Sequence, residues 1–215
     1  MGSEMCIRDS RLLQTLVGSV IRKHQLDGVR AAGSIRQRMA TSFRYYPAAV
    51  DCADFLLDWC EREPCWRTER VRMFGRAQDV PRLVAWYGDA GLGYRYSGLD
   101  HRAAGWPQPL DRLRRSLSER YVQGLNFVLL NRYRDGRDSM GWHRDDERGL
   151  GDRVVSLSLG ATRRLRLEEG GGTVGLELEH GSVLVFDGAL RHALVRTRRP
   201  VGQRINLTFR CLNAA

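Results

Sequence analysis

The spacing of apolar residues predicts helices in the first part of the chain. After Pro47, which the first turn of a helix tolerates, Val50, Ala53, Leu57 and Cys60 recur every three or four positions. This is the spacing of one buried helical face, and it predicts a helix of about four turns.

A second apolar stripe lies at Leu110, Leu113 and Leu117 and predicts a helix over residues 110–121. The arginines between these leucines point away from the stripe, so this helix is expected to pack against a core by one face only. A similar pattern predicts an amphipathic helix over residues 11–26.

The remaining apolar runs are short and end at turn residues, which is typical of β-strands. Because strands do not alternate with helices, the pattern favours a mainly β (α+β) fold, an antiparallel sandwich or jelly roll flanked by N-terminal helices. Ten strands are expected near residues 70–74, 82–87, 93–97, 125–133, 153–159, 162–168, 173–178, 182–186, 192–196 and 204–211.

Length and composition place this fold in a single domain. The chain has 215 residues, 42% hydrophobic and 28% charged, which fits one globular unit. Residues 1–42 contain no Phe, Trp or Tyr, and seven basic against three acidic residues give them a charge of 7 − 3 = +4. We therefore expect a basic N-terminal extension over residues 1–42, disordered or in part an artefact, and the functional domain over residues 43–215.

The net charge of +10 comes from arginine, since Lys23 is the only lysine among 35 basic residues. Arginine binds phosphate and carboxylate groups through a planar fork, so this charge favours a polyanionic partner, although a genome biased toward arginine would give the same composition. Five cysteines without a Cys-x-x-Cys pair indicate neither disulfides nor zinc, and fit the cytoplasm. No apolar run approaches the about 20 residues that span a membrane.

A candidate metal site lies in His143-Arg144-Asp145 and in His192, 47 residues after Asp145. In an extended segment the side chains of His143 and Asp145 point to the same side. Two histidines and one carboxylate can occupy one face of an octahedral Fe(II) ion. Taken alone, the pattern fits ordinary polar histidines equally well.

The strand expected over residues 204–210 alternates strictly between apolar and polar residues. Its two arginines, reaching inward from a strand of about 20 Å, would leave a gap of about 8 Å, the length of a short dicarboxylate. Asn131 and Tyr133 can add hydrogen bonds from another strand. The alternative is a solvated face of an edge strand. The apolar face has Ile205, Leu207 and Phe209, and the polar face has Arg204, Asn206, Thr208 and Arg210.

Further motifs occur between Val71 and Arg210 in a specific order and spacing. They are Pro81-Arg82, Tyr87-Gly88-Asp89, Tyr94-Arg95-Tyr96-Ser97-Gly98, Asn126-Phe127-Val128, Asn131-Arg132-Tyr133, His143-Arg144-Asp145-Asp146-Glu147-Arg148, Ser156-Leu157-Ser158-Leu159-Gly160, His180-Gly181-Ser182, His192 and Arg204-x-Asn206-Leu207-Thr208-Phe209-Arg210. In this order they resemble the AlkB-type DNA alkylation-repair dioxygenases, which depend on Fe(II) and 2-oxoglutarate. Within that family the sequence is most similar to the branch that acts on double-stranded DNA.

The resemblance implies a double-stranded β-helix, a cupin-like jelly roll, and a specific set of site residues. It implies that Fe(II) is bound by His143, Asp145 and His192, with O₂ as a co-substrate. It implies that 2-oxoglutarate is bound by Asn131, Tyr133, Arg204, Asn206 and Arg210. The substrate residues expected with it are Phe74, Arg82, Tyr94, Tyr96, Asp146 and Glu147, of which Asp146 is included for its charge.

Among these substrate residues, the resemblance implies that Tyr96 stacks on a flipped base, that Glu147 faces its exocyclic amine, and that Phe74 wedges into the gap left in the duplex. A base inside a duplex cannot present a methyl group to iron, so it must be extruded. The lesions 1-methyladenine and 3-methylcytosine are cationic, and Glu147 or Asp146 would favour them over neutral bases.

The activity implied is oxidative demethylation of such bases in DNA, with release of formaldehyde, succinate and CO₂. The alternatives are a demethylase of methylated RNA and a non-catalytic nucleic-acid-binding protein of the same fold. We expect a monomer without membrane contact that acts on duplex DNA, with single-stranded DNA also open, in the cytoplasm or in the nucleus of a eukaryote. A phosphate-binding rim or a generic charged surface is expected from Arg163, Arg164, Arg166, Arg191, Arg196, Arg198 and Arg199.

Overall fold

The structure, a computed structural model, describes residues 42–213 except 74–75, 97–98, 104 and 148, and at the other positions of 71–78 and 94–102 the description covers the backbone alone. Within these residues lie the helices α2 (Ala53–Arg62) and α3 (Gln108–Arg120) and thirteen strands. The strands are β1 (Phe43–Tyr46), β2 (Arg67–Met73), β3 (Arg76–Gly88), β4 (Gly93–Tyr96), β5 (Leu99–Arg102), β6 (Phe127–Tyr133), β7 (Met140–His143), β8 (Arg153–Gly160), β9 (Arg163–Glu169), β10 (Gly172–Leu178), β11 (Ser182–Asp187), β12 (His192–Leu194) and β13 (Arg204–Arg210).

The strands form a large sheet, a small sheet and the separate pair β4–β5. The large sheet has seven strands in the order β1-β11-β8-β13-β6-β3-β2, and the small sheet has the order β10-β9-β12-β7. Neighbouring strands run antiparallel throughout the described pairings. The chain crosses from one sheet to the other after β6, β7, β8, β10, β11 and β12, and this repeated crossing between two antiparallel sheets confirms the predicted jelly roll.

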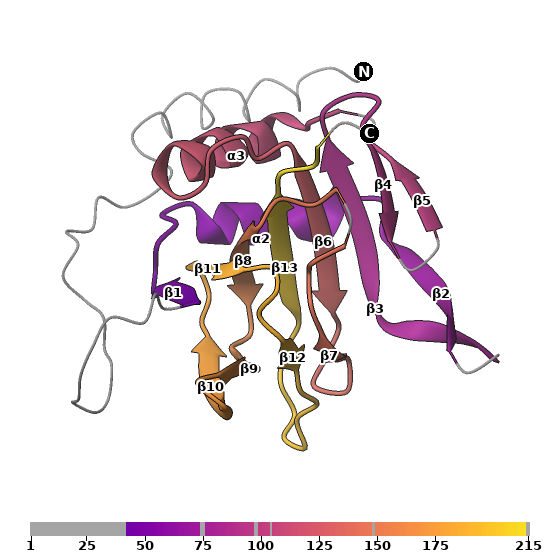
Figure 1. Cartoon of the computed structure of the whole chain (residues 1–215), viewed down its shortest axis with the longest axis vertical. Coiled ribbons are helices and arrows are strands. Elements are labelled where there is room, and N and C mark those ends of the chain that lie inside the picture. Colours follow the sequence, from indigo (N-terminus) through magenta and orange to yellow (C-terminus); the bar gives the residue numbers. More distant parts are fainter. Residues whose placement is uncertain (1–41, 74–75, 97–98, 104, 148, 214–215) are drawn as a thin grey trace, which may run out of the picture.

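The two faces of the large sheet pack against different layers. Leu207 of β13 belongs to a core cluster that also contains Leu56 of α2 and Leu113 of α3. The opposite face packs against the small sheet in a second cluster, where Leu184 of β11 meets Leu165 of β9. In Figure 1 both helices lie in the upper part of the view, and the strands of the small sheet lie in the lower part.

Strand β13 shows how the sequence pattern produces this layering. All seven of its residues are buried, although four are polar or charged. Its apolar residues belong to the cluster on the helical side, while its polar residues line a cavity between the sheets. The strict alternation therefore marks a strand buried on both faces, and the alternative of a solvated edge strand is wrong because β13 lies between β8 and β6.

All ten predicted strands coincide with observed ones, and the short strands β1, β5 and β7 were not predicted. The helix expected after Pro47 begins only at Ala53. Ala48 has a φ of 44°, and the carbonyl of Gly181 accepts the N–H groups of Ala49 and Val50, so this segment is held in a turn.

Residues 11–26, for which a helix is expected, and most of the predicted extension lie outside the described residues. In the part of the chain that the structure describes, no helix is long and apolar enough to cross a membrane.

Candidate active site

Two neighbouring strands of the small sheet bring the three predicted metal ligands together. His143 at the end of β7 lies directly opposite His192 at the start of β12 in the strand register. Asp145 follows two residues after β7, and its carboxylate oxygens lie 3.7 Å from His143 Nε2 and 3.8 Å from His192 Nε2. The three ligand atoms lie within 4.8 Å of one another, a spacing that one metal ion can bridge.

Backbone carbonyls fix both histidines in the tautomer that a metal requires. The Nδ1 atom of His143 lies 2.9 Å from the carbonyl of Gly141, and that of His192 lies 2.8 Å from the carbonyl of Leu190. A carbonyl only accepts, so each Nδ1 carries a hydrogen and each Nε2 is the ring nitrogen left for a metal. Burial, and next the neighbouring His192, lower the pKa of His143 to about 4, which keeps its ring neutral.

A charged neighbour keeps Asp145 ionised. Burial is the largest single influence on Asp145 and by itself raises the pKa, yet Arg210 and the two histidines together outweigh it and lower the pKa. The Nη2 atom of Arg210 lies 2.8 Å from Asp145 Oδ2. The site therefore offers two imidazole nitrogens and one anionic oxygen.

The loop that carries Asp145 is fixed by a close backbone approach. The N–H of Asp145 donates to the carbonyl of Gly188 at 2.8 Å. A Cβ atom at position 188 would lie 2.6 Å from the carbonyl oxygen of Asp145, which is too close for any side chain. Glycine at this turn thus allows the ligand loop to pack against the segment before His192.

The cavity beside the triad contains a buried cation, Arg204, for which no carboxylate partner lies among the described residues. Arg204 is 2% exposed, and its Nη2 donates to Ser158 Oγ at 2.9 Å and to Asn206 Oδ1 at 2.8 Å. Its guanidinium lies over the ring of Tyr133, 5.5 Å from the centroid. Among the described residues its Nε has no hydrogen-bond partner, and burial lowers the pKa of Arg204 to about 10. Such a group fits an anionic ligand that would complete its hydrogen bonds.

The other polar groups that line this cavity largely satisfy one another. Asn131 Oδ1 accepts from Arg82 Nε at 2.7 Å, and Asn206 Oδ1 accepts from Ser156 Oγ at 2.9 Å. Asn206 Nδ2 donates to Thr208 Oγ1 at 2.6 Å. The cavity is lined by Arg82, Leu129, Asn131, Tyr133, Met140, His143, Asp145, Ser156, Leu165, Leu178, Leu184, Phe186, His192, Leu194, Arg204, Asn206, Thr208 and Arg210.

Two serines of this site were not among the predicted site residues. Ser156 and Ser158 lie on β8 directly opposite Thr208 and Asn206 of β13. The signal that could have found them is the Ser-Leu-Ser-Leu alternation of residues 156–159, which repeats the polar-apolar period of β13.

The substrate residues predicted for the site are only partly brought together. Arg82 is buried in the cavity wall, Asp146 is exposed, and Glu147 is half-buried with its Oε2 3.7 Å from Arg210 Nη1. Burial raises the pKa of Glu147. Tyr94 and Tyr96 lie on β4, where the described pairing to β5 concerns the backbone, and Phe74 lies outside the described residues.

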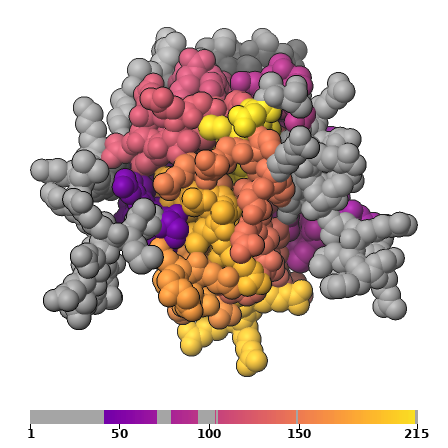
Figure 2. Space-filling model, in the orientation of Figure 1, coloured from indigo at the N-terminus to yellow at the C-terminus, as the bar shows by residue number. Residues whose placement is uncertain are grey.

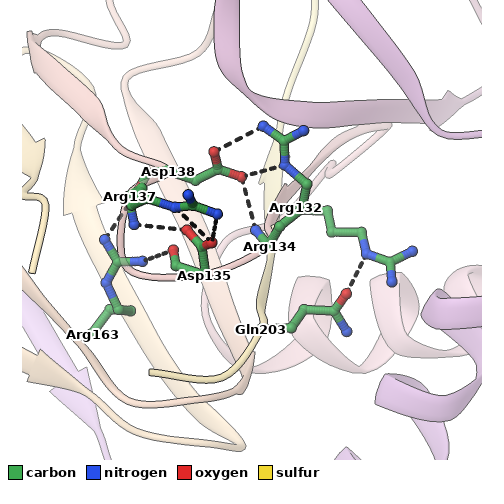
Figure 3. A network of polar contacts seen from close by, with 7 residues as sticks. All are labelled: Arg132, Arg134, Asp135, Arg137, Asp138, Arg163 and Gln203. Atoms are coloured by element: carbon green, nitrogen blue, oxygen red, sulfur yellow. Dashed lines mark hydrogen bonds and ion pairs between the residues drawn. The ribbon is translucent and has the colours of Figure 1, made fainter. Parts of the chain in front are cut away.

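The expected arginine rim is wrong for Arg163. This residue is 3% exposed, and its guanidinium donates to backbone carbonyls, including that of Asp135 at 2.9 Å (Figure 3). Arg191 is partly buried and paired with Glu168. The exposed members of the group are Arg164, Arg166, Arg196, Arg198 and Arg199.

Comparison with known proteins gives the family. The chain matches the 2OG-Fe(II) oxygenase superfamily over residues 48–210 and belongs to that family. It is 41% identical over 157 residues to the DNA oxidative demethylase ALKBH2 of Mus musculus, which covers 66% of this chain and 66% of the relative. It is 34% identical over 187 residues to the alpha-ketoglutarate-dependent dioxygenase alkB homolog 3 of Mus musculus, which covers 77% of this chain and 64% of the relative. The match thus spans about two thirds of the length of these relatives.

Solved structures agree on the fold. An oxidoreductase of the 2OG-Fe(II) oxygenase family from Burkholderia pseudomallei superposes with a TM-score of 0.57 at 16% identity, covering 80% of this chain and 85% of that one. The structure of OsALKBH1 gives a TM-score of 0.54 at 16% identity, covering 81% of this chain and all of the other. These structures confirm the jelly-roll architecture.

The residues present fit the two groups that give the family its name. Two imidazoles and one carboxylate are a donor set that suits Fe(II). The buried Arg204, whose Nε lacks a partner among the described residues, fits a carboxylate of 2-oxoglutarate in the same cavity. The predicted dependence on Fe(II), 2-oxoglutarate and O₂ therefore agrees with both the family and the site.

Proposed function

We propose that this protein removes alkyl groups oxidatively from N-alkylated bases in DNA, such as 1-methyladenine and 3-methylcytosine. The observation that carries the proposal is the single cavity lined by both the His-Asp-His group and the buried Arg204. The printed name of the relatives at 41% identity, DNA oxidative demethylase, supports the choice of DNA and of demethylation.

In this proposal the metal is held by His143, Asp145 and His192. Bound Fe(II), together with 2-oxoglutarate and O₂, supplies the oxidising power that hydroxylates the alkyl carbon, and the products are the restored base, formaldehyde, succinate and CO₂. The carbonyls behind the two histidines keep their Nε2 lone pairs aimed at one point. The apolar wall formed by Leu184 and Phe186 keeps water away from it.

The co-substrate residues we propose are Asn131, Tyr133, Arg204, Asn206 and Arg210. Arg204 would take the far carboxylate, because it is a buried cation of the cavity wall whose Nε lacks a hydrogen-bond partner among the described residues. Arg210 lies at the other end, beside Asp145, where it would hold the end of the ligand next to the metal.

Recognition of the damaged base is assigned first to Glu147. Glu147 carries the carboxylate nearest to Arg210 after Asp145, and a cationic lesion placed there would be attracted over a neutral base. The resemblance to AlkB-type enzymes assigns further contacts to Phe74, Arg82, Tyr94, Tyr96 and Asp146.

Contact with the DNA backbone is assigned to exposed arginines near the site. Arg196, Arg198 and Arg199 lie on the loop between β12 and β13, which projects at the lower edge of the view in Figure 2. Arginines placed in this way bind phosphates without reading sequence, which suits an enzyme that must find rare lesions in duplex DNA. The protein would act as a domain over residues 43–215 in the compartment that holds the DNA, which is the cytoplasm of a prokaryote or the nucleus of a eukaryote.

The test is demethylation of three matched oligonucleotides that each carry one 1-methyladenine, as duplex DNA, single-stranded DNA and RNA. With Fe(II), 2-oxoglutarate and O₂ present, mass spectrometry should show loss of the methyl group from both DNA forms, with duplex preferred. Faster repair of the RNA would replace DNA by RNA as the substrate. Unchanged oligonucleotides together with tight, metal-independent DNA binding would mean that the protein only binds nucleic acid.

A further inference from the structure

One buried arginine joins the two loops on which the candidate site depends. Arg163 is the first residue of β9, and its guanidinium donates from Nη1 to the carbonyl of Asp135 at 2.9 Å, and from Nη2 to those of Asp138 at 2.9 Å and Val195 at 2.8 Å. Asp135 and Asp138 belong to the loop between β6 and β7, and Val195 begins the loop between β12 and β13. We call residues 134–139 and 195–203 the crossover loops.

The crossover loops connect the two halves of the site. Strands β6 and β13 in the large sheet carry Asn131, Tyr133 and Arg204, whereas β7 and β12 in the small sheet carry His143 and His192. Each crossover loop leads from one of these sheets to the other. A ligand that reaches from the metal to Arg204 therefore spans the two sheets, and its fit depends on their spacing.

The crossover loops are packed tightly around Arg163. The Thr197 N–H donates to the carbonyl of Gly136 at 2.9 Å, and a Cβ atom at position 136 would lie 2.3 Å from Thr197 Cγ2. The Asp138 carboxylate accepts three bonds from Arg134, through its backbone N–H at 2.9 Å, Nε at 2.8 Å and Nη2 at 2.9 Å (Figure 3). Such satisfied networks hold one arrangement of the backbone.

Arg163 also adds positive charge near the far end of the ligand. Its charge is one of the causes that lower the pKa of Arg204, after burial, so the two guanidinium groups lie close enough to repel. No carboxylate forms an ion pair with Arg163 among the described residues; its described bonds all go to carbonyls. The end of the cavity near Arg204 is thus more cationic than Arg204 alone would make it.

We propose that Arg163 is a positioning residue of the co-substrate site. It holds the crossover loops together, so that the distance between the metal ligands and Arg204 matches the length of 2-oxoglutarate. The inference rests on the proposed roles of Arg204 and the metal triad. It predicts that loss of Arg163 weakens the binding of a ligand that spans both sheets and leaves unchanged the binding of a ligand that contacts the metal alone.

The experiment is calorimetry on the full chain loaded with Mn(II), with two probes and no nucleic acid. The first probe is 2-oxoglutarate, and the second is oxalate, which chelates a metal but is too short to reach Arg204. In Arg163→Met the dissociation constant of 2-oxoglutarate should rise by about tenfold or more, as is usual when a supporting residue behind a site is lost. Those of oxalate and of Mn(II) should stay within about twofold, which a general loss of structure would not produce.

Two further variants make the test decisive. Arg164→Met removes an exposed arginine next in sequence on β9 and should bind both probes like the wild type. Arg163→Lys keeps the charge, but its three N–H donors sit on one nitrogen and cannot reproduce the bonds that Arg163 makes from Nη1 and Nη2. It should therefore show the same selective loss, and it replaces the methionine variant if that one does not fold. Wild-type affinity for 2-oxoglutarate in Arg163→Lys, or equal weakening of both probes, would overturn the inference. If the wild-type protein bound oxalate but not 2-oxoglutarate, the proposed function and this inference would both be wrong.

Discussion

The guanidinium of Arg210 lies 2.8 Å from the carboxylate of Asp145, and both side chains are almost completely buried. This contact joins β13, a central strand of the large sheet, to a metal ligand that follows β7 of the small sheet. It lowers the pKa of Asp145 against the opposing influence of burial. The charge state of the metal ligand therefore depends on a residue of the co-substrate strand.

The first prediction concerns this pair. Arg210→Met leaves Asp145 as a buried anion without its main partner, which destabilises a protein by about 3–5 kcal/mol. We expect a lower melting temperature without metal, partly restored by Mn(II), and loss of demethylation. The exposed Arg164→Met serves as the control for removal of an arginine. An unchanged melting temperature in Arg210→Met would contradict the proposed coupling.

Replacement of Arg204 should have the opposite effect on stability from replacement of Arg210. It is a buried cation whose Nε lacks a partner among the described residues, so replacing it with methionine removes an unfavourable burial. We expect Arg204→Met to melt at or above the wild-type temperature without ligand. Because ligand binding raises stability by mass action, 2-oxoglutarate should raise the melting temperature of the Mn(II)-loaded wild type but not that of the variant. A clear ligand-dependent rise in Arg204→Met would show that the far carboxylate binds elsewhere.

The charge of Glu147 should set the preference for cationic lesions. Glu147→Gln keeps the shape of the side chain but removes its negative charge beside Arg210. We expect kcat/KM for 1-methyladenine to fall by about tenfold, the size of one partly screened charge interaction, while that for a neutral N-methylated base stays the same. Measuring both substrates in one mixture excludes differences in active enzyme. A similar fall for both bases would mean that Glu147 acts on the site in general.

Stability at high pH should depend on Cys60 in α2. Burial raises the pKa of Cys60 from 9.0 to about 12. Between these values the unfolded thiol loses its proton while the folded one keeps it, so the free energy of unfolding falls as the pH rises, by up to about 1.4 kcal/mol per pH unit. Urea titrations from pH 8 to 11 should show a smaller decline in Cys60→Ala than in the wild type. The exposed Cys65→Ala is the matched control, and an equal decline in all three proteins would contradict the assignment.

The architecture could be predicted from the sequence where burial follows a simple period. The alternation of β13 predicted which of its residues face the cavity, and the interval between His143 and Asp145 predicted a shared side. The short strand β7 was missed because its four residues show no regular apolar face, and two of them, Met140 and His143, line the cavity. The late start of α2 was missed because it depends on the carbonyl of Gly181, which lies far away in the sequence.

The burial of Arg163 could not be predicted from the sequence. Arg163, Arg164 and Arg166 look alike in the pattern of β9, yet only the first is buried. Its burial depends on three carbonyls from two loops that the fold brings together. No local period carries that information, so a residue expected at the surface lies inside.

The most direct test of the central claim is the stoichiometry of succinate and repaired base in a single-turnover reaction on duplex DNA that carries one 1-methyladenine. We expect one succinate for each methyl group lost, and no repair without 2-oxoglutarate or in His143→Ala. The DNA affinity of this variant should stay unchanged because phosphate contacts dominate binding. Succinate formed without loss of the methyl group would keep the oxygenase site and contradict its assignment to damaged DNA.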